Sequence, residues 1–61
     1  MKTSSIIYSI LLDNNIVAVF DTLEMARLDF QSAKEAYSGD NYFKELTLVD
    51  SDGVIHLTHN F

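Results

Sequence analysis

The sequence contains no cysteine and no proline, and only two glycines, Gly39 and Gly53, among its 61 residues. Without cysteine, neither a disulfide nor a thiolate metal cluster can stabilise the chain. Two isolated glycines exclude a glycine-rich phosphate-binding loop. No apolar run approaches the roughly 20 residues of a membrane span, and the short apolar run at residues 6–12 lacks the length and cleavage site of a secretory signal. We therefore expect a cytoplasmic protein that does not bind membranes.

Basic residues are also few, with four lysines and arginines against nine aspartates and glutamates, for a net charge of −5. Four scattered cations form no stripe that could follow a phosphate backbone, so direct nucleic-acid binding is not expected. The chain is 48% hydrophobic and 21% charged, which is too apolar for an intrinsically disordered protein. Because so short a chain buries only about 60% of its unfolded surface, we expect a single domain over residues 1–61 that a second chain could stabilise.

Apolar and turn-forming residues predict two β-hairpins. The first has strands at residues 5–12 and 16–20, joined at Asp13-Asn14-Asn15, whose residue types tolerate positive φ. The second has strands at residues 43–50 and 54–58, joined at Asp50-Ser51-Asp52-Gly53. Residues 59–61 are expected to form a short tail.

A helix is predicted between the hairpins. Asp21 is expected to cap its first turn, with Glu24 reaching back in a capping box. Gly39 is expected to adopt a left-handed conformation after the helix ends near Tyr37 or Ser38, before a short loop through Asp40 and Asn41. The apolar stripe of the helix comprises Leu23, Ala26, Phe30, Ala33 and Tyr37, with Arg27 and Lys34 at its edge, where their stems cover the sheet and their charges reach water.

These elements predict an α+β fold of the order ββαββ, with a four-stranded, mainly antiparallel sheet and one helix on one face. The strand at 5–12 is apolar on both faces, which is typical of an interior strand. A right-handed crossover and an interior first strand favour the order 2-1-3-4, since the alternative leaves that apolar strand at an exposed edge.

One helix covers only one face of such a sheet, so apolar side chains remain on the other. We expect the helix to meet Leu46, Leu48, Ile55 and Leu57. Periodicity leaves open whether the first strand turns Ile6, Tyr8, Ile10 and Leu12 or instead Ile7 and Leu11 away from the helix. A contiguous apolar patch usually marks an interface, so a homodimer or another protein partner is predicted at the back of the sheet or at an edge strand. The predicted interface residues are Ile6, Tyr8, Ile10, Leu12, Phe43 and Val49.

The candidates for chemistry are weak. Asp50-Ser51-Asp52-Gly53 resembles the start of a calcium loop, but its glycine comes two positions early and a strand follows, so a hairpin turn is preferred. His56 and His59 point to opposite faces of an extended strand, and no cysteine is available as a further zinc ligand. Four strands and one helix leave little depth for a catalytic pocket. We expect no enzyme activity, no metal and no cofactor.

The acidic residues permit alternative functions. Glu24, Asp29, Glu35, Asp50 and Asp52 could form an acidic surface that imitates nucleic acid in the basic groove of a nuclease. Because the carboxylates are scattered, their simpler role is to keep the protein in solution. Two further alternatives are a protein that sequesters a small, nucleotide-like ligand between protomers and a structural subunit of a larger assembly.

Residues 6–50, and above all the segment VAVFDTLEMARLDF at residues 17–30, resemble small uncharacterised ββαββ proteins of bacteriophages and mobile elements. In these proteins a hairpin ends in an aromatic residue, a capping residue follows, and an alanine-bearing helix packs on the sheet. The resemblance implies no catalytic residues. It implies a compact phage protein that binds and inhibits or modulates a host enzyme or defence complex, in the cytoplasm of a bacterial host.

Overall fold

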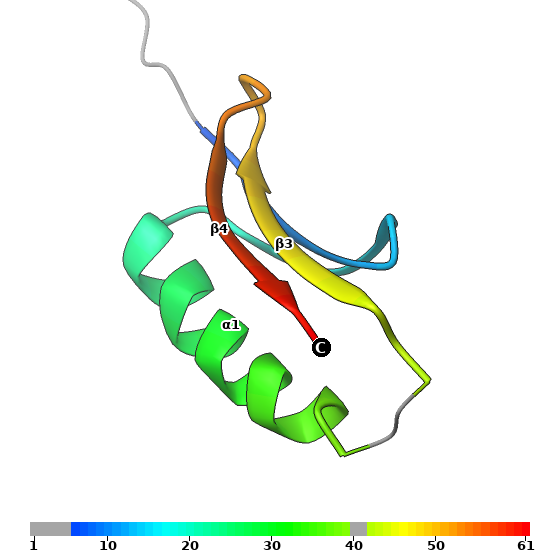
Figure 1. Ribbon diagram of the computed structural model, residues 1–61. Coiled ribbons are helices and arrows are strands. Elements are labelled where there is room, and N and C mark those ends of the chain that lie inside the picture. Colours follow the sequence, from blue (N-terminus) through cyan, green and yellow to red (C-terminus); the bar gives the residue numbers. More distant parts are fainter. Residues whose placement is uncertain (1–5, 40–41) are drawn as a thin grey trace, which may run out of the picture.

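The computed structural model describes residues 6–39 and 42–61, which form one antiparallel sheet and one helix (Figure 1). The elements are β1 (Tyr8–Leu12), β2 (Asn15–Phe20), α1 (Leu23–Tyr37), β3 (Glu45–Asp50) and β4 (Ile55–Asn60). The strand order is β2-β1-β3-β4, so the predicted ββαββ fold and its order are confirmed. Within these residues no helix has the length and apolar character needed to cross a membrane.

The core lies between α1 and the face of the sheet that carries the even-numbered residues of β1. Ile10 is fully buried there and is paired with Ala18 of β2 on one side and Leu48 of β3 on the other. The buried residues are Ile10, Leu12, Ala26, Phe30, Leu46 and Leu48. β1 is thus an interior strand, and the structure resolves the open choice by turning the Tyr8, Ile10 and Leu12 set toward the helix.

The first hairpin closes with a two-residue turn, because Leu12 is paired directly with Asn15. Asp13 and Asn14 have φ angles of 52° and 72°, which asparagine and aspartate tolerate better than most residues. The Asp13 carboxylate also accepts hydrogen bonds from the backbone N–H groups of Lys44 (3.0 Å) and Glu45 (2.9 Å). The predicted turn is confirmed at Asp13 and Asn14, whereas Asn15 already belongs to β2, and Asp13 additionally fixes the start of β3. β1 itself begins at Tyr8; residue 5, where the strand was predicted to begin, lies outside the described residues.

The ends of α1 differ from the prediction. Its N-cap is Thr22 rather than Asp21, since the Thr22 hydroxyl accepts a hydrogen bond from the Met25 N–H at 3.3 Å. Glu24 therefore sits one position too early for a capping box, although it still lies at the positive end of the helix dipole. At the other end, Ser38 caps the helix in a right-handed conformation, and Gly39 does not adopt the left-handed one. The predicted loop through Asp40 and Asn41 lies outside the described residues.

The strands of the second hairpin begin one or two residues nearer the C-terminus than predicted. Gly53 has the expected positive φ, 87°, in the turn. β4 continues to Asn60, because His59 pairs with Leu46 and Asn60 with Glu45, so these two residues are not a tail. β3 begins at Glu45, and Phe43 precedes it and packs against the core.

A bulge in β4 reverses one predicted orientation. Leu48 pairs with Leu57, but Val49 pairs with Ile55, so His56 is an extra residue in the strand. Paired residues share a face of the sheet, which places Ile55 with Val49 on the side away from α1. The prediction that Ile55 meets the helix is therefore wrong, and its side chain is 61% exposed.

The bulge predicts unequal effects of two truncations. Leu48→Ala should lower the free energy of unfolding by about 2–5 kcal/mol, because it leaves a cavity beneath α1. Ile55→Ala should cost about 1 kcal/mol or less, since little apolar surface is uncovered. Urea unfolding followed by circular dichroism measures both, and equal costs would contradict the assigned faces.

Candidate protein-binding surface

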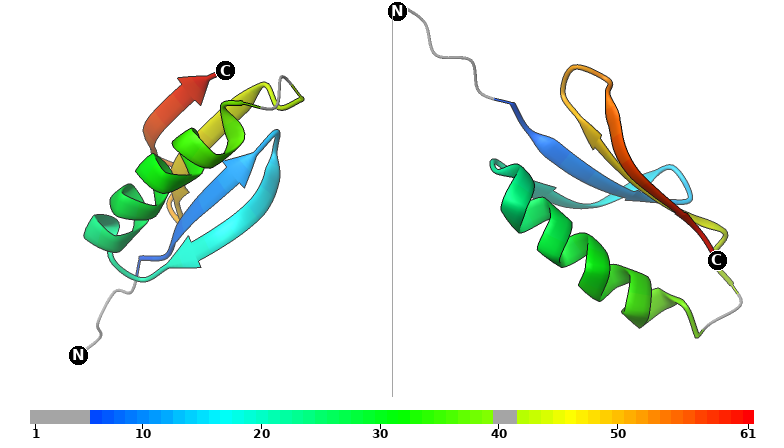
Figure 2. Two further views of the ribbon diagram at one scale, coloured as in Figure 1. Left: turned by 90° about the horizontal axis from the view of Figure 1, so that it is seen from below. Right: turned by 60° about the vertical axis from the view of Figure 1, so that its left-hand side comes forward.

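The face of the sheet opposite α1 is covered by no described segment (right-hand view of Figure 2). The pairing register places apolar side chains from all four strands on it. We call this the uncovered face; its apolar residues are Leu11, Ile16, Val19, Val49 and Ile55. The side chains at its outer strands are the most exposed of these, at 53% for Val19 and more than 60% for Ile16 and Ile55. Ser9 and Thr47 lie among them on the same face, so the surface is mixed but carries several exposed apolar side chains, as interfaces often do.

β2 forms one edge of the sheet and carries no charged residue and no proline. Ile16, Val17 and Val19 are all exposed on it. The outer side of β2 also has backbone N–H and C=O groups that are free to pair with another strand. The Asp13 N–H donates to the Glu45 carbonyl, so by antiparallel alternation the odd-numbered residues of β1 form their backbone hydrogen bonds with β3. Ser9 therefore does not bond to its β2 partner Val19, whose N–H and C=O point away from the sheet. A long apolar edge without charge is a template for pairing with another strand.

The groove between β2 and α1 is shallow and lined partly by small residues. Val17, in a β-bulge, faces Ser32 and Ala36 of α1 across a volume of about 360 Å³. Asp29 lies at the same side and is half-buried. Short side chains on the helix would let a second element approach β2 closely.

The six residues predicted as an interface lie in different places. Ile10 and Leu12 are buried beneath α1, and Tyr8 is half-buried on that same face, so this set does not form the exposed surface. Phe43 packs against the core, while Ile6 is half-buried ahead of β1. Val49 alone of the six is on the uncovered face. The surplus apolar surface therefore belongs to β2 and to single residues of the other three strands, Leu11, Val49 and Ile55, and not to the predicted set as a whole.

Asp50 is held by the second turn. Its Oδ1 accepts hydrogen bonds from the backbone N–H groups of Asp52 (2.9 Å) and Val54 (3.0 Å), and its Oδ2 lies 2.8 Å from His56 Nε2. Its side chain is only 6% exposed. The Val54 hydrogen bond, followed by the one with His56, holds the pKa of Asp50 below its usual range. Asp50 was predicted both in this turn and as a possible member of an acidic surface, and an aspartate that opens an Asp-x-Asp-Gly turn is typical of this backbone bonding.

The other acidic residues do not converge. Glu24 and Glu35 lie on one side of α1, and Asp29 is roughly 140° away around the helix from Glu24. Asp52 is exposed in the turn at the far end of the sheet. The carboxylates are thus divided among separate surfaces, which does not favour imitation of a regularly charged nucleic acid.

The two histidines also remain apart. His56 is the extra residue of the bulge and packs against Tyr8, with ring centroids 5.5 Å apart. His59 lies beside Phe61, at 4.8 Å between centroids. In residues 6–39 and 42–61 no three histidine, aspartate or glutamate side chains are placed to share a metal ion.

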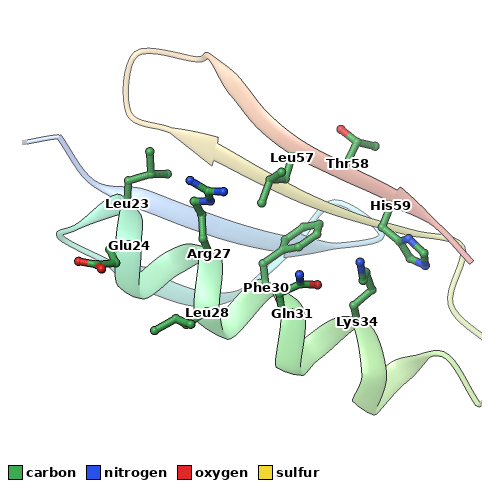
Figure 3. Close-up of a pocket in the computed structure, with 10 residues that line it drawn as sticks. All are labelled: Leu23, Glu24, Arg27, Leu28, Phe30, Gln31, Lys34, Leu57, Thr58 and His59. Atoms are coloured by element: carbon green, nitrogen blue, oxygen red, sulfur yellow. The ribbon is translucent and has the colours of Figure 1, made fainter.

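A second groove lies between α1 and β4 and was not predicted (Figure 3). It has a volume of about 700 Å³ and is lined by Leu23, Glu24, Arg27, Leu28, Phe30, Gln31, Lys34, Leu57, Thr58 and His59. We call it the α1–β4 groove. Arg27 and Lys34 were predicted at the edge of the helix stripe. His59 lines the same groove because β4 extends beyond its predicted end.

Comparisons with known proteins add no relative to these observations. No protein-family model, no curated protein and no solved structure matches the chain. Its function is therefore argued from its own surfaces.

The turn predicts a specific dependence of stability on pH. An ionised Asp50 with a lowered pKa contributes stability that is present above its unfolded pKa of about 3.9 and is lost as the pH falls through the lower folded value. Asp50→Asn should therefore lower the urea midpoint at neutral pH, and the difference from the unmodified chain should shrink below about pH 4. Asp52→Asn, an exposed control in the same turn, should have little effect, and equal pH profiles for both variants would contradict the assigned role of Asp50.

Proposed function

We propose that this chain is a small non-enzymatic protein-binding module that acts through its sheet as a homodimer. The observation that carries the proposal is β2, an open edge strand without charge whose exposed side chains continue onto the uncovered face. Natural proteins normally protect such an edge with lysine, proline or a covering segment. Pairing with a second copy would cover the edge and so prevent uncontrolled aggregation through it.

The second copy fits this edge by symmetry. Antiparallel pairing of β2 with its counterpart gives an isologous contact about a twofold axis and joins the two sheets into one. Both helices then lie on the same side of the joined sheet, where Ser32 and Ala36 offer little steric hindrance between them. The two uncovered faces become one continuous apolar surface that is available to a further protein.

The partner proposed for that surface is an enzyme or defence complex of a bacterial host, which the protein inhibits or modulates. An inhibitor of this kind needs a surface that covers the partner's active or binding site. It does not need catalytic residues of its own. The exposed apolar side chains of the uncovered face are suited to this, and the resemblance of residues 6–50 to small bacteriophage proteins supports the class of partner. The Asp50–His56 pair is held by the turn, so it supports a structural rather than a catalytic role.

Lysine in the middle of β2 tests self-association. Val19→Lys should convert a dimer to a monomer, because a charge on an edge strand opposes pairing. Leu28→Lys makes the same change at a 65% exposed position of α1 and should leave the dimer intact. Sedimentation velocity over a range of concentrations distinguishes the two, and an unmodified chain that remains monomeric would contradict the proposed dimer.

Lysine on the other outer strand tests partner binding separately from dimerisation. Ile55→Lys should leave the dimer intact but abolish the capture of host proteins that the unmodified chain captures, since it places a charge on the uncovered face. Affinity capture from a bacterial extract with mass spectrometry measures this, with Glu35→Lys, at an exposed position of α1 that lines neither groove, as control. Identical captured proteins for both variants would contradict binding at this face.

A further inference from the structure

The α1–β4 groove gathers positive charge in an acidic protein. Two of the four lysines and arginines, Arg27 and Lys34, line it from α1, and His59 lines it from β4. Arg27 and Lys34 are seven residues apart, which places them on the same side of the helix, and Figure 3 shows both extending toward β4. In the described part of the chain neither forms an ion pair. Among the described residues that line the groove, Glu24 is the one carboxylate, and it lies toward the N-terminal end of α1.

The floor of the groove is apolar. Leu23 and Phe30 from α1 and Leu57 from β4 line it between the charged residues. Phe30 is almost fully buried, and Leu23 and Leu57 are half-buried against the core. The groove thus offers an apolar base with positive side chains above it, a combination that suits a ligand with both apolar and acidic groups.

The backbone of β4 is open along the same groove. β4 is the second edge of the sheet, opposite β2. The Phe61 N–H donates to the Lys44 carbonyl at 2.9 Å. By antiparallel alternation, the backbone groups of Leu57 and His59 then bond to their β3 partners Leu48 and Leu46. Thr58 and Asn60 therefore direct their N–H and C=O groups outward, where a further strand could bond to them.

We infer that the α1–β4 groove binds an extended acidic peptide segment of a partner protein, which adds to the sheet as a strand beside β4. Its backbone bonds to Thr58 and Asn60, and every second side chain points into the groove. Carboxylates among these side chains meet Arg27 and Lys34, while apolar ones rest on Leu57. The charge complementarity selects an acidic segment over a basic or neutral one.

The dimensions favour a peptide over a compact anion. From Leu23 to Lys34 the helix rises about 16 Å, which equals the length of about five residues in a strand. The two cations are about 10 Å apart along the helix axis, so one small anion does not contact both closely. β4 itself has six residues, which is enough to pair along this length.

This inference rests on the proposal that the chain binds proteins, but it uses the edge opposite β2. Joining two copies through β2 leaves β4 open at both ends of the joined sheet. A chain that binds the acidic peptide as a monomer would overturn the proposed dimer and not the groove. A dimer that binds no peptide would overturn the groove alone.

Fluorescence anisotropy with a labelled peptide of alternating threonine and glutamate tests the groove. The unmodified chain should bind it and should not bind the corresponding threonine–lysine peptide. Arg27→Glu and Lys34→Glu should each weaken binding by about tenfold or more, because each removes a charge-assisted contact. Lys44→Glu makes the same change in charge outside the groove and should have a much smaller effect. Equal losses for all three variants, or no binding to the unmodified chain, would overturn the inference.

Residue-resolved amide exchange tests the added strand in the same complex. Exchange at Thr58 and Asn60 should slow when the threonine–glutamate peptide is bound, whereas exchange at Leu57 and His59 should change little because those amides already bond to β3. Binding without slower exchange at Thr58 and Asn60 would show that the peptide does not extend the sheet and would overturn the proposed mode.

Discussion

A single helix against a four-stranded sheet can bury one face of that sheet, and this constraint determines the rest of the described structure. α1 packs its stripe around Phe30 onto Ile10 and Leu48, and in the described residues these side chains form the buried core together with Leu12, Ala26 and Leu46. The opposite face is left with apolar side chains from every strand. The binding surfaces that we propose therefore follow directly from the fold.

The two edge strands differ in what they present. β2 offers apolar side chains and lies beside short residues of α1, so it suits self-pairing. β4 lies beside Arg27 and Lys34, so it suits a partner segment of opposite charge. Each strand contains a bulge, at Val17 and at His56. The bulges decide which side chains lie at each edge. An extra residue shifts the alternation by one, so the strand residues before it point to the opposite face from the one that regular alternation would give.

Much of the fold could be predicted from the sequence. The strand order followed from β1, whose apolar residues on both faces require an interior position. The turns at Asp13 and Gly53 followed from residues that tolerate positive φ. The side of β1 that meets the helix could not be predicted, since Ile10 and Leu11 are equally apolar. The helix cap was also ambiguous, because Asp21 and Thr22 are both good capping residues, and in the structure Thr22 is the one that accepts the hydrogen bond from Met25.

The candidate surfaces were predicted less well than the fold, because they depend on details of β4 that its sequence pattern does not show. A bulge leaves no periodic signal in a short strand, so the alternation of residues 54–58 placed Ile55 in the predicted core. The polar residues His59 and Asn60 continue no apolar pattern, so the predicted strand ended before them. As a result, the groove that joins His59 to Arg27 and Lys34 was missed. The general expectation of surplus apolar surface was useful, but the structure locates that surface on β2 and the uncovered face rather than on Tyr8, Ile10 and Leu12.

The most direct measurement of this account is amide exchange of the unmodified chain alone over a range of protein concentrations. The Val19 amide, which points outward from β2, should exchange more slowly as the concentration rises, while the Thr58 amide of β4 should remain fast. That result would show that the open β2 edge pairs with a second copy. Exchange at Val19 that is independent of concentration, or protection of Thr58 instead, would contradict the account.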